Sequence, residues 1–175
     1  EYLLQNYYNA KSVSLDNKII VIESDDWGSI RMPNKKSYDA LLKAGIRVDK
    51  SKYNSYDCLE SDEDLMLLFE VLLNNKTSNG NPKFTFNTVM QNPDFHKIRD
   101  NKFEEFYGEN LFTSYINYYG KELKYLWDNA ISENLMFPQF HAREHLNAHF
   151  WLHDLKSGTK DTLTAFDVGF FGLKT

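Results

Sequence analysis

Ile19-Ile20-Val21-Ile22-Glu23-Ser24-Asp25-Asp26-Trp27-Gly28 joins an apolar β-branched run to two adjacent carboxylates and a glycine. Such a run is typical of a strand that is buried on both faces of a sheet. We therefore predict a strand over Ile19–Glu23, with Asp25 and Asp26 following its end. Two neighbouring carboxylates repel each other and need hydration or a positive partner. A metal ion is one such partner, and an Asp-rich turn or helix cap is the alternative.

The chain of 175 residues is long enough for one domain with a sizeable core, so we treat residues 1–175 as a single domain. Hydrophobic residues make up 42% and aromatic residues 15%, which excludes a disordered chain. The net charge of -5 and the absence of a Lys/Arg cluster argue against nucleic-acid and anionic-membrane partners. No apolar run is long enough to span a bilayer. The single cysteine, Cys58, excludes an intramolecular disulfide and favours a reducing compartment such as the cytoplasm.

Hydrophobic periodicity predicts strands that alternate with helices. Ser61 and Asp64 form a capping-box pattern that begins the clearest helix. The other predicted helices cover residues 36–43, 120–133 and 142–155, residues 1–18 form a short helix or an irregular segment, and the later strands cover 84–90, 135–140 and 163–168. This order predicts an α/β fold with right-handed crossovers and a mostly parallel sheet or barrel.

Polar residues stand at the end of each predicted strand. In α/β folds of this kind the ligand lies beyond the carboxyl ends of the strands. We therefore expect these residues to converge on one face of the molecule. They are Asp25 and Asp26, Asn87 and Gln91, Gln139 and His141, and Asp167.

His141-Ala142-Arg143-Glu144-His145 is the strongest partner for the two aspartates. Histidines four residues apart lie on one face of a helical turn, where their rings can share a metal ion. Two ordinary histidines at the start of a helix are the alternative. Because both motifs stand at strand ends on the same predicted face, we favour a site of two histidines and one carboxylate. That ligand set suits zinc or a similar divalent ion.

Together the two motifs resemble those of the polysaccharide deacetylases of the NodB-homology type. In that family an Asp-Asp pair at a strand end supplies a catalytic base and a metal ligand, and a His-x-x-x-His after the third strand supplies two more ligands. The resemblance implies that Asp25 is the base and that Asp26, His141 and His145 hold the metal. It also implies a distorted (β/α) barrel, usually of seven strands, that removes acetyl groups from a carbohydrate substrate.

The chain departs from the family pattern in several places. Trp27 separates Asp26 from Gly28, where the family has Asp-Asp-Gly, and Ala142 stands where the family has Ser or Thr. No arginine follows Arg143, and the family's later general-acid histidine has no match. The resemblance therefore covers the N-terminal half of a barrel. A truncated domain, a partner that completes it, and a branch that uses other residues are the open explanations.

Three residues are candidates for substrate binding. Trp27 is suited to stack on a sugar ring and Asn87 to hydrogen-bond the substrate, with core packing and loop capping as the alternatives. Arg143, or Arg31, is suited to pair with Asp25 and keep it ionised, with a surface ion pair as the alternative.

Two further functional hypotheses stand beside the hydrolase. One is a non-catalytic sugar-binding or interaction module that retains the metal pocket. The other is a non-haem iron oxygenase, which also uses two histidines and one carboxylate. Because an incomplete parallel sheet leaves an open edge, we also expect self-association into a homo-oligomer.

Overall fold

The computed structural model describes residues 2–10, 12, 16 and 18–173, which form a mixed α/β fold. Its helices are α1 (Tyr2–Asn9), α2 (Lys35–Lys43), α3 (Lys52–Tyr56), α4 (Asp62–Asn74), α5 (Phe95–Asp100), α6 (Leu111–Tyr119), α7 (Lys124–Ser132), α8 (Ala148–Lys156) and α9 (Lys160–Asp167), with a short 3₁₀ turn, η1 (Val48–Lys50). Its strands are β1 (Glu23–Trp27), β2 (Phe84–Val89), β3 (Gln91–Pro93), β4 (Gly108–Asn110) and β5 (Met136–Ala142).

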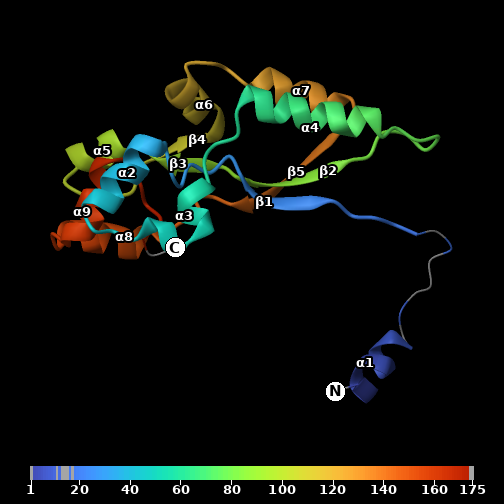
Figure 1. The fold of residues 1–175 in the computed structure, drawn as a ribbon, viewed down its shortest axis with the longest axis horizontal. Helices are drawn as coiled ribbons and strands as arrows, with labels where there is room; N and C mark the ends of the chain where they lie inside the picture. The colour runs from blue at the N-terminus through green and yellow to red at the C-terminus, as the bar shows by residue number, and fades with distance from the viewer. Residues whose placement is uncertain (1, 11, 13–15, 17, 174–175) are drawn as a thin grey trace.

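The main sheet has three parallel strands in the order β1-β2-β5. Figure 1 shows α4 and α7 together over one face of this sheet, while α2, α5, α8 and α9 gather beyond the carboxyl ends of its strands. The short strands β3 and β4 form a separate antiparallel pair. The predicted α/β class with parallel strands is therefore confirmed, and the described strands do not close into a barrel.

The largest core cluster lies between the sheet and α4, α6 and α7. Helix α4 begins with the predicted capping box: the Ser61 hydroxyl accepts the Asp64 N–H, and the Asp64 side chain accepts the Ser61 N–H. Its apolar face then buries Leu65, Phe69 and Leu72. Their i, i+4, i+7 spacing is that of a helix packed on a core.

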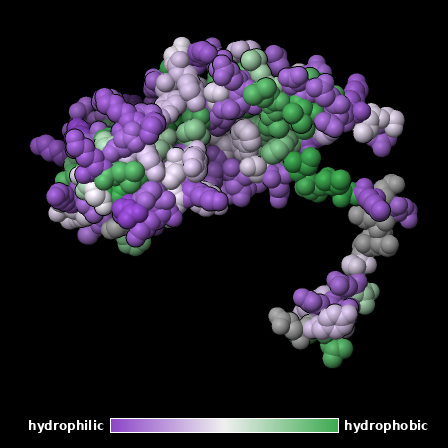
Figure 2. Space-filling model, in the orientation of Figure 1, coloured by the Kyte–Doolittle hydropathy of each residue, from purple (hydrophilic) through white to green (hydrophobic). Residues whose placement is uncertain are grey.

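The apolar run before β1 is exposed, so the prediction of a doubly buried strand over Ile19–Glu23 is wrong. The strand begins at Glu23, and Ile20 is 87% exposed. Figure 2 shows this hydrophobic stretch standing away from the body of the protein. The reason is that β1 is an edge strand whose pairing with β2 begins at the Ile22 carbonyl, which accepts the Thr85 N–H at 2.9 Å, so no described strand flanks residues 19–21. Self-association through such an edge stays a prediction.

The predicted strand over 163–168 is also wrong, because residues 163–167 lie in helix α9 and Val168 is its C-cap. Thr162, Ala165 and Phe166 are buried at helical spacing, and α9 packs against α8. A short apolar window does not distinguish a strand from a buried helix. Asp167 therefore stands at a helix end, where it pairs with Arg99 at 2.5 Å, and it does not join the other strand-end residues.

The helix predicted over 142–155 begins at Ala148. Strand β5 runs on to Ala142, whose carbonyl accepts the Met90 N–H at 3.0 Å. The Arg143 carbonyl likewise accepts the Gln91 N–H at 2.9 Å. These backbone bonds hold the start of the segment extended, so the two histidines do not share a helical turn.

Two other sequence predictions concern helices. Helix α7 begins later than predicted, at Lys124, because Gly120 ends a preceding helix, α6, with a left-handed φ of 67°. Of residues 1–18, Tyr2–Asn9 form α1, while residues 1, 11, 13–15 and 17 lie outside the described residues. Within the described part of the chain, no helix has the length and apolar character needed to cross a membrane.

Candidate metal centre

Asp25 and Asp26 lie in the last part of β1, where the strand bulges. The register with β2 shifts between Ser24 and Trp27, and Asp26 has a φ of 67°. A positive φ is uncommon for a residue other than glycine, although Asp tolerates it better than most. Bulges re-aim side chains beside functional sites, and strained residues cluster there. Here the bulge directs one Asp26 oxygen towards the two predicted histidines.

Asp26, His141 and His145 come together although they lie on separate segments. The Oδ1 atom of Asp26 is 3.2 Å from Nε2 of His141 and 3.2 Å from Nε2 of His145. One ligand atom from each residue lies within 4.8 Å of the other two. Ligands of a tetrahedral zinc ion at roughly 2.0–2.1 Å are separated by about 3.3–3.4 Å. The two distances from Asp26 are therefore close to those of a zinc site.

The Asp26 Oδ1 atom is buried and lacks a hydrogen-bond donor among the described residues. Both imidazoles approach it within ion-pair distance but without hydrogen-bond geometry. Leaving a buried polar atom unpaired costs free energy, more so for a charged group. A cation beside this oxygen would remove that cost. The donor set and the orphaned oxygen both fit a divalent ion.

Asp25 has a different environment from its neighbour. Its side chain is exposed, and its Oδ1 accepts a hydrogen bond from Asn87 Nδ2 at 2.6 Å. Asn87 stands in β2 beside Gln139 of β5. The predicted strand-end asparagine thus lies at the site, where it orients the proposed base; its predicted contact with substrate stays a prediction.

Arg31 and Asp57 form a second layer behind His145. The Arg31 guanidinium donates to Nδ1 of His145 at 2.8 Å, and its Nε lies 3.1 Å from an Asp57 oxygen. Burial raises the pKa of Asp57 to about 6, and Arg31 opposes that shift. We predicted that Arg31 or Arg143 pairs with Asp25, but Arg31 contacts His145 and Asp57 instead. Asp57 carries no local sequence signal, because no motif links residues so far apart in the chain.

The Arg31 contact also sets the tautomer of His145. A guanidinium can only donate, so Nδ1 acts as the acceptor and the ring proton of a neutral imidazole is on Nε2. A metal on Nε2 needs that proton on Nδ1 instead. Arg31 would therefore have to give up this hydrogen bond for His145 to hold a metal ion through Nε2.

Trp27 and Arg143 make contacts within the protein. The Trp27 ring stacks on Phe86 with a centroid distance of 3.8 Å and packs edge-on against Phe84. Arg143 pairs with Glu144, which also accepts a hydrogen bond from Gln91. These contacts are the packing and ion-pair roles considered as alternatives, and binding of substrate by either residue stays a prediction.

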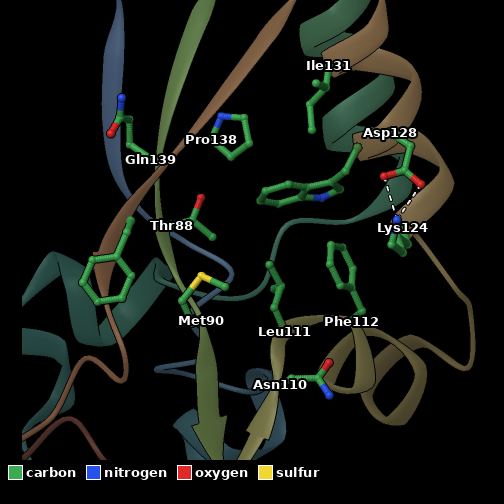
Figure 3. A pocket seen from close by; sticks show the side chains of 12 residues that line it. Thr88, Met90, Asn110, Leu111, Phe112, Lys124, Asp128, Ile131, Pro138 and Gln139 are labelled. Carbon is green, nitrogen blue, oxygen red and sulfur yellow. Dashed lines mark hydrogen bonds and ion pairs between the residues drawn. The ribbon is translucent and has the colours of Figure 1, made fainter.

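Two of the cavities border the main three-stranded sheet. One, of about 590 Å³, is polar. Its lining residues are Ser24, Asp25, Asp26, Arg31, Tyr53 and His145. The other is an apolar groove of about 480 Å³ between β5 and helices α6 and α7, with residues such as Leu111, Phe112 and Pro138 on its walls and the Lys124–Asp128 ion pair beside it (Figure 3). Because both acids and a histidine line the polar cavity, we take it as the candidate site.

Comparisons of this chain with protein-family models, with curated proteins and with solved structures give no match. The geometry of the site and the two motifs are therefore the evidence for its function.

Proposed function

We propose that this chain is a metal-dependent hydrolase that removes acetyl groups from a carbohydrate, built on a barrel-like fold of the NodB type. The observation that carries the proposal is the buried Asp26 oxygen, which lies 3.2 Å from the Nε2 atoms of both His141 and His145. The open polar cavity that Asp26 and His145 share with Asp25 gives room for a substrate group beside them.

Asp26, His141 and His145 would hold the divalent ion, zinc in this proposal. When bound there, such an ion supplies Lewis-acid polarisation of a carbonyl and acidifies a coordinated water. The two histidines bring neutral nitrogen donors and Asp26 brings one negative charge. Three protein ligands leave at least one coordination position for water or substrate, as in catalytic zinc sites.

In this proposal Asp25 acts as the general base. Asn87 occupies one of its oxygens, fixing the plane of the carboxylate, while the side chain remains open to the cavity. The second oxygen can then accept a proton from a water that attacks an acetyl carbonyl. Proton transfer by a positioned group of this kind contributes about 10²–10⁴-fold to rate.

Two measurements test the proposal. Protein purified without chelator should contain near-stoichiometric metal, and His141→Ala should lose most of it. His153→Ala is the matched control, because this histidine is 73% exposed and belongs to α8 rather than to the cluster. Asp25→Asn should keep its metal yet release acetate from acetylated oligosaccharides about 10²–10⁴-fold more slowly.

The sugar-binding module is the second candidate function. Tyr53 favours it, because this exposed aromatic residue lines the same cavity and is suited to stack on a sugar face. If the metal-loaded parent protein binds oligosaccharides but releases no acetate from any of them, the module replaces the hydrolase. Equal metal content in His141→Ala and the parent would remove the metal site from both proposals.

A further inference from the structure

A buried carboxyl group lies directly behind the turn that carries Asp26. Glu60 belongs to the loop between α3 and α4 and does not line the polar cavity. Its Oε2 accepts a hydrogen bond from the Gly28 N–H at 3.1 Å, and its Oε1 accepts one from the Tyr115 hydroxyl. The proposed hydrolase mechanism gives Glu60 no role, so its position needs another explanation.

The backbone of Gly28 is held from both sides. Its N–H donates to Glu60, and its carbonyl accepts a hydrogen bond from Asn92 Nδ2 at 2.8 Å. Gly28 has a φ of 87°, and a Cβ there would lie 2.5 Å from a Leu111 methyl and 3.0 Å from the Val89 carbonyl. The turn after Asp26 is thus pressed close to β2 and α6, where a backbone N–H has little access to water.

Glu60 is itself fixed by a chain of hydrogen bonds from the helices. Trp127 Nε1 in α7 donates to the hydroxyl of Tyr115 in α6 at 3.2 Å, and Tyr115 donates to Glu60. Tyr115 is 0% exposed. Burial raises the pKa values of both Glu60 and Tyr115. These hydrogen bonds connect helices α6 and α7 to the turn that follows Asp26.

We propose that Glu60 is a positioning residue that fixes the Asp26–Gly28 turn and, through it, the direction of the Asp26 carboxylate. The positive φ of Asp26 is a conformation that the chain leaves unless its surroundings enforce it. Without an acceptor at Glu60, the Gly28 N–H would be left unpaired next to Leu111 and Val89. The turn would then relax, and the Asp26 oxygen would leave its position between the two imidazoles.

The experiment compares Glu60→Leu with Glu60→Gln. Leucine removes the acceptor, whereas glutamine keeps an oxygen for the Gly28 N–H and offers its NH₂ to the Tyr115 oxygen. The first readout is hydrogen exchange of the Gly28 amide by NMR, scaled to the global stability of each variant. The second is zinc affinity by calorimetry, which rests on the proposed function. We expect Glu60→Leu to lose Gly28 protection and to bind zinc about 10–100-fold more weakly, while Glu60→Gln stays close to the parent.

Tyr119→Phe is the matched control. It removes a neighbouring hydrogen bond, from the Tyr119 hydroxyl to the Leu59 carbonyl, without touching Gly28. It should lower stability and leave both readouts unchanged. If Glu60→Leu does not fold, Tyr115→Phe replaces it and should move both readouts in the same direction to a smaller extent.

The two possible failures can be separated. Gly28 exchange in Glu60→Leu that equals the parent value, or zinc affinity that falls as far in Tyr119→Phe, would overturn the role of Glu60. A parent protein that binds no zinc would overturn the proposed function instead. In that case Gly28 exchange alone decides whether Glu60 holds the turn.

Discussion

Replacing Asp26 with glycine should stabilise the metal-free protein, although it destroys the proposed site. Asp26 has a φ of 67°, and its Oδ1 is buried without a hydrogen-bond donor among the described residues. Glycine adopts this φ readily and brings no carboxylate. If Asp26 is present for metal binding rather than for folding, removing it relieves two unfavourable terms at once. A trade-off of this kind between stability and activity is common at functional sites.

The size of the effect follows from those terms. The left-handed conformation costs a residue such as Asp about 1 kcal/mol, and an unpaired buried polar group costs about 1–3 kcal/mol. The greater freedom of glycine in the unfolded chain subtracts about 0.5–1 kcal/mol. The net gain is about 1–3 kcal/mol, and each kcal/mol raises the Tm of a chain of this length by about 2–4 °C.

Thermal unfolding in the presence of a chelator measures the stability that Asp26→Gly gains over the parent. The measurement is made at about pH 8, where histidine is ordinarily neutral, so that an Asp–His ion pair does not contribute. Asn134→Gly is the matched control, because Asn134 has a φ of 57° but no carboxylate, so its gain should be smaller. Added zinc at about 100 times its Kd should then stabilise the parent by about 2.7 kcal/mol and Asp26→Gly hardly at all. A metal-free Asp26→Gly protein that melts below the parent would contradict this prediction, because it would show that the carboxylate supports the fold.

The second layer gives two more predictions. Arg31→Met should raise zinc affinity about tenfold, because it removes a nearby positive charge and frees His145 Nδ1 to carry the ring proton; weaker zinc binding, measured by calorimetry, would contradict this. Burial raises the pKa of Asp57 from 3.8 to about 6, so the folded state holds this proton more tightly than the unfolded state. The free energy of unfolding should therefore decrease as the pH rises from about 4 to about 6, by on the order of 1–2 kcal/mol after solvent screening. Urea titrations of Asp57→Asn should show a smaller decrease over the same pH range.

The elements predicted well are those with a local signal. Ser61 and Asp64 encode the start of α4 through a capping box within four residues. Helix α6 also has a local signal, although we did not predict this helix. Its buried residues Leu111, Ser114 and Tyr115 follow helical spacing after the cap residue Asn110. The burial of a strand is different, since it depends on which strands flank it. Ile19–Ile22 has the composition of a central strand, but the described sheet provides a neighbour only at Ile22, through the Thr85 N–H, and leaves residues 19–21 without one.

The site was predictable to the extent that its ligands belong to short motifs. Asp26, His141 and His145 come together as expected, although the helical turn invoked for the histidines does not exist. Strand β5 places the first histidine, and the following bend returns the second, so that the two rings lie nearly parallel with centroids 5.9 Å apart. Asp57 and Glu60 were missed because their contacts join segments that no spacing rule connects.

The bulge in β1 explains how adjacent aspartates acquire different environments. In a regular strand, neighbouring side chains point to opposite faces. The register shift and the positive φ of Asp26 change that alternation, so both residues reach one cavity. Asp25 then receives a hydrogen-bond donor from Asn87, whereas the Oδ1 of Asp26 receives two imidazoles and no donor. A carboxylate that already has a donor and faces open space can take part in proton transfer. A buried carboxylate oxygen between two nitrogens is suited to hold a cation, and this difference is the physical basis for dividing the two roles.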